Sequence, residues 1–221
     1  MMIRTQEDLE DLIEEWGFVP FFSNEIEGFS ISEQIDRKLW FTAEEGPWEW
    51  KGRIALKGKC AYGKLFGKKA GFVSRKWFAD LLNYRRNGYD FDALYDEGKA
   101  PDKDREIIDL LGEYHALTTK EIKPLLGYGK NGRKGYDTII TRLQMETYVI
   151  VKNFVYAVDK NGAFYGWGIA QYTTPEEMFG EAYVRRAYKR DPEESLKRII
   201  KQIRKIVPGT DEETVRRFIA Q

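Results

Sequence analysis

Residues 118–151 decide the fold, and they read TTKEIKPLLGYGKNGRKGYDTIITRLQMETYVIV. Thr118, followed three residues later by Glu121, is typical of a capping box and predicts that a helix begins here. Pro124 lies inside this helix and predicts that it is short, because proline lacks an amide donor and clashes with the preceding turn. The glycines at 127, 129 and 132 then predict a turn.

The spacing of apolar residues predicts a second helix over 134–147. The residues on its apolar face are Tyr136, Ile139, Ile140 and Leu143. The stretches 148–151 and 155–158 are rich in β-branched and aromatic residues, which strands prefer. Asn161-Gly162 predicts a hairpin turn, with 163–169 as the returning strand. Helix, turn, helix and hairpin is the element order of a winged helix, whose second helix normally enters the major groove of DNA.

The composition is typical of a globular protein, with 221 residues, of which 33% are charged and 42% are hydrophobic. Cys60 has no second cysteine to pair with, and this suits a reducing compartment. Residues 1–15 are acidic and amphipathic, so they lack the basic start and apolar core of a secretory signal. No stretch of the sequence has the length and hydrophobicity of a membrane span. We therefore expect a cytoplasmic protein without a membrane partner.

Charge is segregated along the chain, although the formal net charge is zero. Residues 1–50 carry three Lys or Arg against thirteen Asp or Glu, whereas 51–79 carry nine basic residues and no acidic one. Residues 80–119 carry five basic and ten acidic residues, and 120–152 carry seven basic and three acidic ones. Such asymmetry suits a charged binding face, because local potential attracts phosphate. The alternative is that these segments neutralise one another after folding.

Together these patterns predict an α+β protein in three parts. Residues 1–100 form an aromatic-rich α+β region, with an aromatic, turn-rich corner at 46–51 and mainly β structure from 54 to 74. We treat 51–76 as the basic β segment of this region. A winged helix-turn-helix module then occupies 101–175, and 176–221 form closing helices.

Several strings resemble a group of bacterial proteins described as AlkZ-related. They are Pro-Trp-Glu-Trp-Lys at 47–51, Ala-Tyr-Gly-Lys at 61–64, Lys-Ala-Gly-Phe-Val-Ser at 69–74, Gly-Tyr-Asp at 135–137, Thr-Arg-Leu-Gln-Met at 141–145 and Tyr-Gly-Trp at 165–167. The resemblance covers residues 40–180. This group is named for a distant similarity to the AlkZ and YcaQ DNA glycosylases, which are built from winged-helix units and excise crosslinked or alkylated bases. The resemblance therefore implies a bacterial protein with a role linked to DNA repair.

The resemblance also implies where a catalytic pair would lie. AlkZ glycosylases are similar to one another in a Gln-X-Asp pair, and Gln34-Ile35-Asp36 has this pattern. The chemistry is reasonable, because a carboxylate can activate water or stabilise a developing oxocarbenium ion. However, Arg37-Lys38 follow instead of an apolar run, and the tandem winged-helix units of a full glycosylase do not fit in 221 residues. The alternative interpretation is an exposed polar turn of helix.

Nucleic-acid contacts are expected from the outward face of the second helix, the loop before it and the basic segment. The expected residues are Lys134, Thr138, Thr141 and Arg142 on the helix, Lys130 and Arg133 on the loop, and Lys64, Lys68 and Lys69 on the basic segment. Lysines can contact phosphates while aromatic neighbours such as Tyr62 stack on bases. In a strand, however, alternating lysines and aromatics are also typical of one solvent-exposed face and one buried face, with no ligand involved. Acidic Asp137 on the same helix argues against phosphate contact.

The leading hypothesis is a nucleic-acid-binding winged-helix protein that acts without catalysis, with DNA as its partner. One alternative is a DNA glycosylase that uses Gln34 and Asp36. The other is a protein-interaction scaffold whose winged helix contacts a protein partner. One His and one Cys exclude the usual Cys/His zinc site, so we expect no metal. The glycines at 127–135 follow a helix and match no phosphate-binding fingerprint, so no cofactor is expected.

Overall fold

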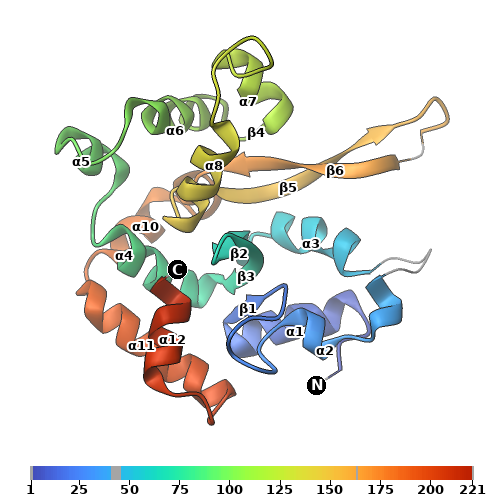
Figure 1. The fold of residues 1–221 in the computed structure, drawn as a ribbon, viewed down its shortest axis with the longest axis vertical. Helices are drawn as coiled ribbons and strands as arrows, with labels where there is room; N and C mark the ends of the chain where they lie inside the picture. The colour runs from blue at the N-terminus through green and yellow to red at the C-terminus, as the bar shows by residue number, and fades with distance from the viewer. Residues whose placement is uncertain (1, 41–45, 163, 221) are drawn as a thin grey trace.

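The computed structural model describes residues 2–40, 46–162 and 164–220. Across these residues the fold is α+β, with two antiparallel three-stranded sheets surrounded by helices. The two sheets lie one above the other near the middle of the molecule (Figure 1). None of the helices in the described ranges has the length and apolar character that crossing a membrane requires.

The first sheet belongs to the N-terminal region and has the strand order β1-β3-β2. Its elements, with the neighbouring helices, are α1 (Gln6–Trp16), β1 (Phe18–Pro20), α2 (Ile31–Gln34), the 3₁₀ turn η1 (Arg37–Trp40), β2 (Cys60–Phe66) and β3 (Lys69–Ser74). Strands β2 and β3 form a hairpin, in which Tyr62 pairs with Phe72 and Phe66 pairs with Lys69. The expected β structure is therefore confirmed over 60–66 and 69–74.

Residues 47–56 form helix α3 (Pro47–Leu56), so the expected turn-rich corner at 46–51 and the β structure from 54 are wrong there. Two features start this helix. Pro47 occupies its first turn, where proline is favoured, and Glu49 Oε2 accepts a hydrogen bond of 2.9 Å from the Gly46 amide. Helix α4 (Arg75–Arg86) also begins directly after β3. The basic segment 51–76 therefore contains a helix and a hairpin instead of continuous β structure.

Gly17 ends helix α1 at a φ of +81°, a conformation in which a side chain is strained. A Cβ at this position would also lie 2.2 Å from Trp77 Cδ1. We expect Gly17→Ala to lower the free energy of unfolding by about 2 kcal/mol or more, measured by urea denaturation. Gly28 is a matched control, because its φ is +73° but no atom lies within 4 Å of a built Cβ. Equal losses from both alanine variants would contradict the clash with Trp77.

Residues 102–173 contain a second set of elements in the order helix, strand, helix, helix and hairpin. These elements are α6 (Asp102–Tyr114), β4 (Leu117–Thr118), α7 (Thr119–Leu125), α8 (Tyr136–Met145), β5 (Ile150–Val158) and β6 (Phe164–Thr173), and the sheet order is β4-β6-β5. The predicted capping box is confirmed, because the Thr118 amide donates to Glu121 Oε2 at 2.7 Å. The predicted hairpin is also confirmed and extends beyond the body of the molecule (Figure 1). Ala163, predicted to begin its second strand, lies outside the described residues.

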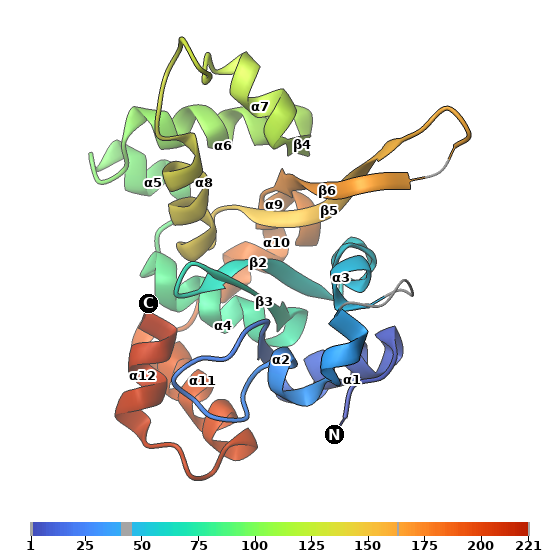
Figure 2. The same ribbon diagram turned by 45° about the vertical axis from the view of Figure 1, so that its right-hand side comes forward.

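The last helices pack around α4. They are α9 (Pro175–Phe179), α10 (Glu181–Ala187), α11 (Pro192–Ile206) and α12 (Glu212–Ala220), while α5 (Phe91–Asp96) lies between α4 and α6. Gly180, at a φ of +91°, separates α9 from α10 among the closing helices expected over 176–221. One cluster of buried side chains contains Tyr62 of β2 together with Ile140 and Leu143 of α8. This shared core fixes the β2–β3 hairpin against α8, which stands above β2 (Figure 2).

Candidate functional site

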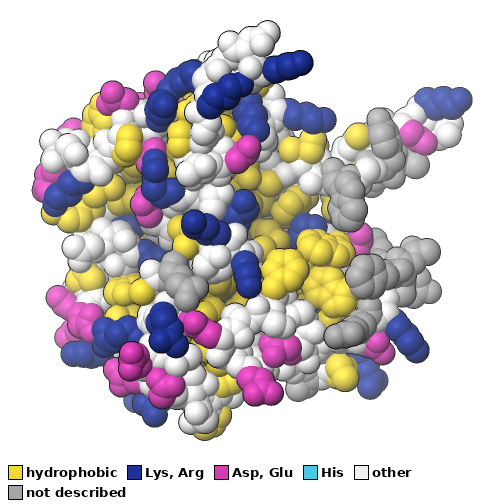
Figure 3. All heavy atoms as spheres, viewed as in Figure 1, with side chains coloured by type: hydrophobic (Ala, Val, Ile, Leu, Met, Phe, Trp, Pro, Cys, Tyr) yellow, Lys and Arg dark blue, Asp and Glu magenta, His cyan; other side chains and the backbone are white. Residues whose placement is uncertain are grey.

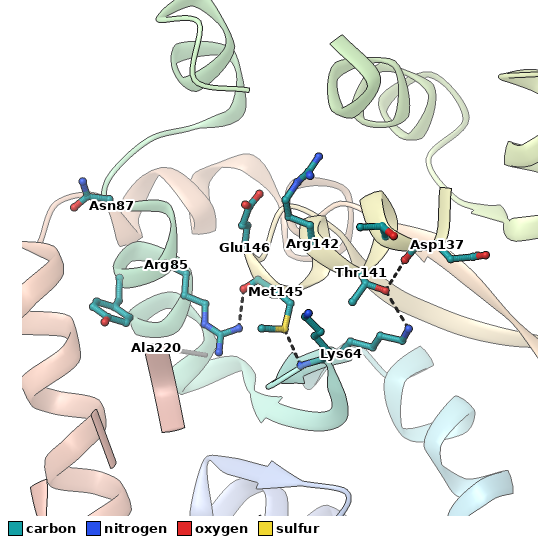
Figure 4. Close-up of a pocket in the computed structure, with 12 residues that line it drawn as sticks. Lys64, Arg85, Asn87, Asp137, Thr141, Arg142, Met145, Glu146 and Ala220 are labelled. Carbon is teal, nitrogen blue, oxygen red and sulfur yellow. Dashed lines mark hydrogen bonds between the residues drawn. The ribbon is translucent and has the colours of Figure 1, made fainter. Parts of the chain in front are cut away.

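A groove of about 880 Å³ lies between α8 and the β2–β3 hairpin. Its lining residues are Asp137, Thr138, Thr141, Arg142, Met145 and Glu146 from α8 and its C-cap, Lys64 and Lys68 from the hairpin, Tyr84, Arg85 and Asn87 from the end of α4, and Ala220 from α12. Side chains from α8 and from the hairpin point towards one another across it (Figure 4). Lys and Arg side chains gather near the centre of the same face (Figure 3). The groove therefore joins segments that are far apart in the sequence.

Three hydrogen bonds hold the hairpin against one flank of α8. Lys64 Nζ donates to Thr141 Oγ1 at 3.0 Å, and the Lys64 amide donates to Gln144 Oε1 at 3.0 Å. The Lys68 amide donates to Met145 Sδ at 3.1 Å. Thr141 Oγ1 in turn donates to the Asp137 carbonyl at 2.7 Å, so this hydroxyl is both donor and acceptor. The backbone of the hairpin is thereby positioned beside the C-terminal half of α8.

Arg142 is oriented by a carboxylate on α6. Its guanidinium donates to both oxygens of Asp104, with Nε 3.2 Å from Oδ2 and the second bond from Nη2 to Oδ1. Only 2% of Asp104 is exposed, and burial raises its pKa while the adjacent Arg142 acts in the opposite direction. Part of the positive charge of Arg142 is therefore neutralised inside the protein. The same ion pair fixes α8 to α6.

The basic residues of the loop before α8 lie outside the groove, and two of them donate hydrogen bonds to other parts of this chain. Arg133 Nη1 donates to Glu106 Oε2 at 2.5 Å and to the Leu126 carbonyl at 3.2 Å. Lys134 precedes α8, which begins at Tyr136 and not at 134, and its Nζ donates to the Gly129 carbonyl at 2.9 Å. Lys130 is exposed and also lies outside the lining of the groove. The structure therefore does not bring Lys130, Arg133 and Lys134 together with the outward face of α8.

Lys69 also lies apart from Lys64 and Lys68. Its Nζ is 3.5 Å from the Ser23 carbonyl, and it lines a separate hollow with Phe66 and Phe218. Of the nine residues expected to contact nucleic acid, the groove contains five: Lys64, Lys68, Thr138, Thr141 and Arg142. These five come from the hairpin and α8.

Glu146 caps α8 at the edge of the groove, on the same side as Arg142 (Figure 4). Burial raises the pKa of its carboxyl, although the Arg142 charge partly opposes this shift. A carboxyl whose folded-state pKa is raised destabilises the fold once it ionises, so its cost appears as pH rises through that pKa. We expect Glu146→Gln to melt at a higher temperature than the unaltered protein at about pH 7 and at the same temperature at about pH 4. The exposed Glu113→Gln is the control, and a pH-independent gain in Glu146→Gln would contradict this prediction.

The chain matches the family model described as "AlkZ related" over residues 3–220. It belongs to the AlkZ-related family. The resemblance inferred from the sequence is thus confirmed, over more of the chain than the expected 40–180. Comparison with curated protein sequences found no match. Among solved structures, the Streptomyces sahachiroi DNA glycosylase AlkZ is similar to this chain, with a TM-score of 0.47 and 12% sequence identity over 91% of this chain and 51% of that chain. The chain therefore spans about half the length of that AlkZ protein.

In this AlkZ-related chain, Gln34 and Asp36 lie at the junction of α2 and η1, away from the residues that line the groove. The side-chain Nε2 of Gln34 donates to the Gly28 carbonyl at 2.9 Å. Asp36 is exposed, and its Oδ1 accepts a hydrogen bond of 2.9 Å from the Lys38 amide. Both side chains therefore form hydrogen bonds to nearby backbone.

Seven groove residues of this AlkZ-related chain were not among the expected contacts: Tyr84, Arg85, Asn87, Asp137, Met145, Glu146 and Ala220. Arg85 Nη1 donates to the Met145 carbonyl at 2.7 Å, and its Nη2 donates to the Ile219 carbonyl at 3.1 Å. It thereby connects the ends of α4, α8 and α12. Asn87 has a φ of 49° in the left-handed region, and Asn87-Gly88 in the sequence indicates only the turn that ends α4. No local pattern places Tyr84, Arg85 or Asn87 beside α8, whereas Glu146 lies within the helix predicted over 134–147.

Proposed function

We propose that this AlkZ-related protein binds nucleic acid, without catalysis, through the groove between α8 and the β2–β3 hairpin. The observation that carries the proposal is that Lys64 and Lys68 share one groove with Thr138 and Thr141 of α8. Cations aligned beside hydroxyl donors suit a phosphate backbone, because phosphates are the main determinants of affinity in nucleic-acid complexes. DNA is the favoured ligand because the family is named for AlkZ, which is described as a DNA glycosylase. This relation also favours a role in DNA repair.

The element order supports a winged helix over α6 to β6. Helix α6, strand β4, helices α7 and α8 and the β5–β6 hairpin follow one another, with the sheet order β4-β6-β5. In such a module the second helix of the helix-turn-helix, here α8, contacts the nucleic acid. We propose that this module spans the predicted range 101–175, between the aromatic-rich region at 1–100 and the helices at 176–221.

The charges in the groove favour the two hairpin lysines as phosphate ligands. Arg142 is paired with Asp104, and Asp137 is paired with Lys123, whose Nζ lies 3.2 Å from Asp137 Oδ1. Within the described ranges, neither Lys64 nor Lys68 forms an ion pair with a carboxylate of this chain. Both side chains are exposed, so their charges are available to a ligand.

Binding of fluorescently labelled DNA, followed by anisotropy at about 50 and about 200 mM salt, tests this proposal. We expect measurable affinity at low salt that falls steeply at higher salt, because bound phosphates release counterions when lysines replace them. Absence of binding at low salt would reject the proposal and favour the protein-interaction scaffold. Release of an alkylated base, abolished by Asp36→Asn with DNA binding retained, would instead favour a glycosylase that uses Gln34 and Asp36.

A further inference from the structure

The β2–β3 hairpin covers one flank of the helix that would read DNA. The Lys64 side chain and the Lys64 and Lys68 amides are hydrogen-bonded to Thr141, Gln144 and Met145 over the C-terminal half of α8. At the same contact, a Cβ built on Gly63 would lie 3.1 Å from Gln144 Oε1, so the hairpin backbone packs directly against the Gln144 side chain. The exposed face of α8 therefore forms one wall of a groove instead of a free ridge.

A helix with such a neighbour is too wide for the major groove. An α-helix with its side chains is about 10–12 Å across, and the major groove of B-DNA is about 12 Å wide. The helix alone fills that space, so a hairpin bonded to its flank would collide with the phosphate backbone. Entry by the N-terminal end is also disfavoured, because the Asp137 carboxylate there is 82% exposed and would face the phosphates even while it pairs with Lys123.

The groove itself has the composition that a single strand requires. Lys64 and Lys68 lie on the hairpin wall, where they can contact consecutive phosphates. Tyr84 also lines the groove, at the end of α4, and it is half-buried, so the part of its ring that is not packed against the core can stack on an unpaired base. Thr138 and Asn87 offer hydrogen bonds to base edges. A volume of about 880 Å³ is within the range of pockets that enclose small ligands, roughly 300–1,000 Å³, and it suits a short segment of one strand.

We propose that the groove binds a single strand of nucleic acid in preference to a duplex, with Lys64 and Lys68 on its backbone and Tyr84 stacked on a base. This inference rests on the proposed function. It names single-stranded nucleic acid as the ligand of the same groove. It also gives a stacking role to Tyr84, which the pattern of charges along the sequence does not indicate.

The test compares a labelled DNA strand, the RNA strand of the same sequence and the DNA duplex, each titrated with the full-length protein. We expect at least one of the single strands to bind about tenfold more tightly than the duplex. Tyr84→Ala should weaken binding of that strand about tenfold, because the stacking surface is lost. Tyr84→Phe keeps the ring and should stay within about twofold of the unaltered protein, and thermal melting of both variants verifies their folding.

The outcomes separate this inference from the proposed function. Duplex binding as tight as strand binding, and equally sensitive to Lys64→Glu, would overturn the single-strand inference and leave nucleic-acid binding by the groove intact. Loss of affinity in Tyr84→Phe equal to that in Tyr84→Ala would overturn the stacking role. If neither strand nor duplex binds, the proposed function itself fails. Whichever of the DNA and RNA strands binds more tightly identifies the sugar that the groove prefers.

Discussion

Reversing the charges of Lys64 and Lys68 together is expected to lower the affinity for nucleic acid about 100-fold or more at low salt. The double variant Lys64→Glu/Lys68→Glu removes two phosphate contacts and places two carboxylates beside the backbone. Both lysines are exposed, and the backbone bonds from their amides to Gln144 and Met145 remain. Thermal stability should therefore change little, since surface substitutions usually alter the free energy of unfolding by less than about 0.5 kcal/mol.

The matched control is the charge reversal of an exposed lysine elsewhere. Lys189 lies between α10 and α11 and is not among the groove residues. Lys189→Glu lowers the net charge of the protein by two charges, half the change in the double variant, so it tests whether general electrostatic attraction explains the binding. We expect Lys189→Glu to retain affinity within about threefold of the unaltered protein. An equal loss in the control and in the double variant would argue against the groove as the binding site.

Arg86→Met is expected to lower the free energy of unfolding by about 3 kcal/mol or more, because it breaks a buried network. The Arg86 side chain is fully buried in the contact between α4 and the helices around it. Its guanidinium donates to Glu176 Oε1 at 2.7 Å, to Tyr188 Oη at 2.8 Å and to the Thr147 carbonyl at 2.8 Å, and it lies 4.3 Å from the Tyr148 ring centre. Methionine fills much of the volume but leaves these acceptors without their donor.

Urea denaturation of Arg86→Met and Arg185→Met measures this effect. Arg185 also pairs with a glutamate, Glu181, but its side chain is 76% exposed. We expect the Arg185 variant to stay within about 0.5 kcal/mol of the unaltered protein, as is usual for a surface ion pair. Similar losses from both variants would contradict a specific role for the buried network around Arg86.

Local signals in the sequence predict most of the second set of elements. The capping box at Thr118 and Glu121, the apolar spacing of α8 and the turn at Asn161-Gly162 are all short-range features, and each appears as expected. The prediction from local signals was wrong over 47–56, where the chain forms helix α3. The aromatic and turn-forming residues at 46–51 are more typical of a turn between elements than of the start of a helix. There, Pro47 and Glu49 at the first turn decided the structure, and tertiary packing buried Trp50 and Ile54.

The groove was less predictable, because it depends on contacts between distant segments. Lys64 and Thr141 are 77 positions apart, and no periodicity indicates that one donates to the other. Arg142 was expected to face nucleic acid freely, but its pairing with Asp104, 38 positions earlier, depends on how α6 packs against α8. Arg133 donates to Glu106 and Lys134 donates to the Gly129 carbonyl. A count of basic residues does not distinguish side chains bonded within the protein from side chains that contact a ligand.

The most direct test of the groove is the salt dependence of binding for the unaltered protein and for Lys64→Ala/Lys68→Ala. Each lysine that neutralises a phosphate of a single strand contributes about 0.7 to the slope of log affinity against log salt. We predict that the double variant still binds at low salt, with a slope shallower by about 1.4. An unchanged slope in the double variant would contradict binding of phosphates by this groove.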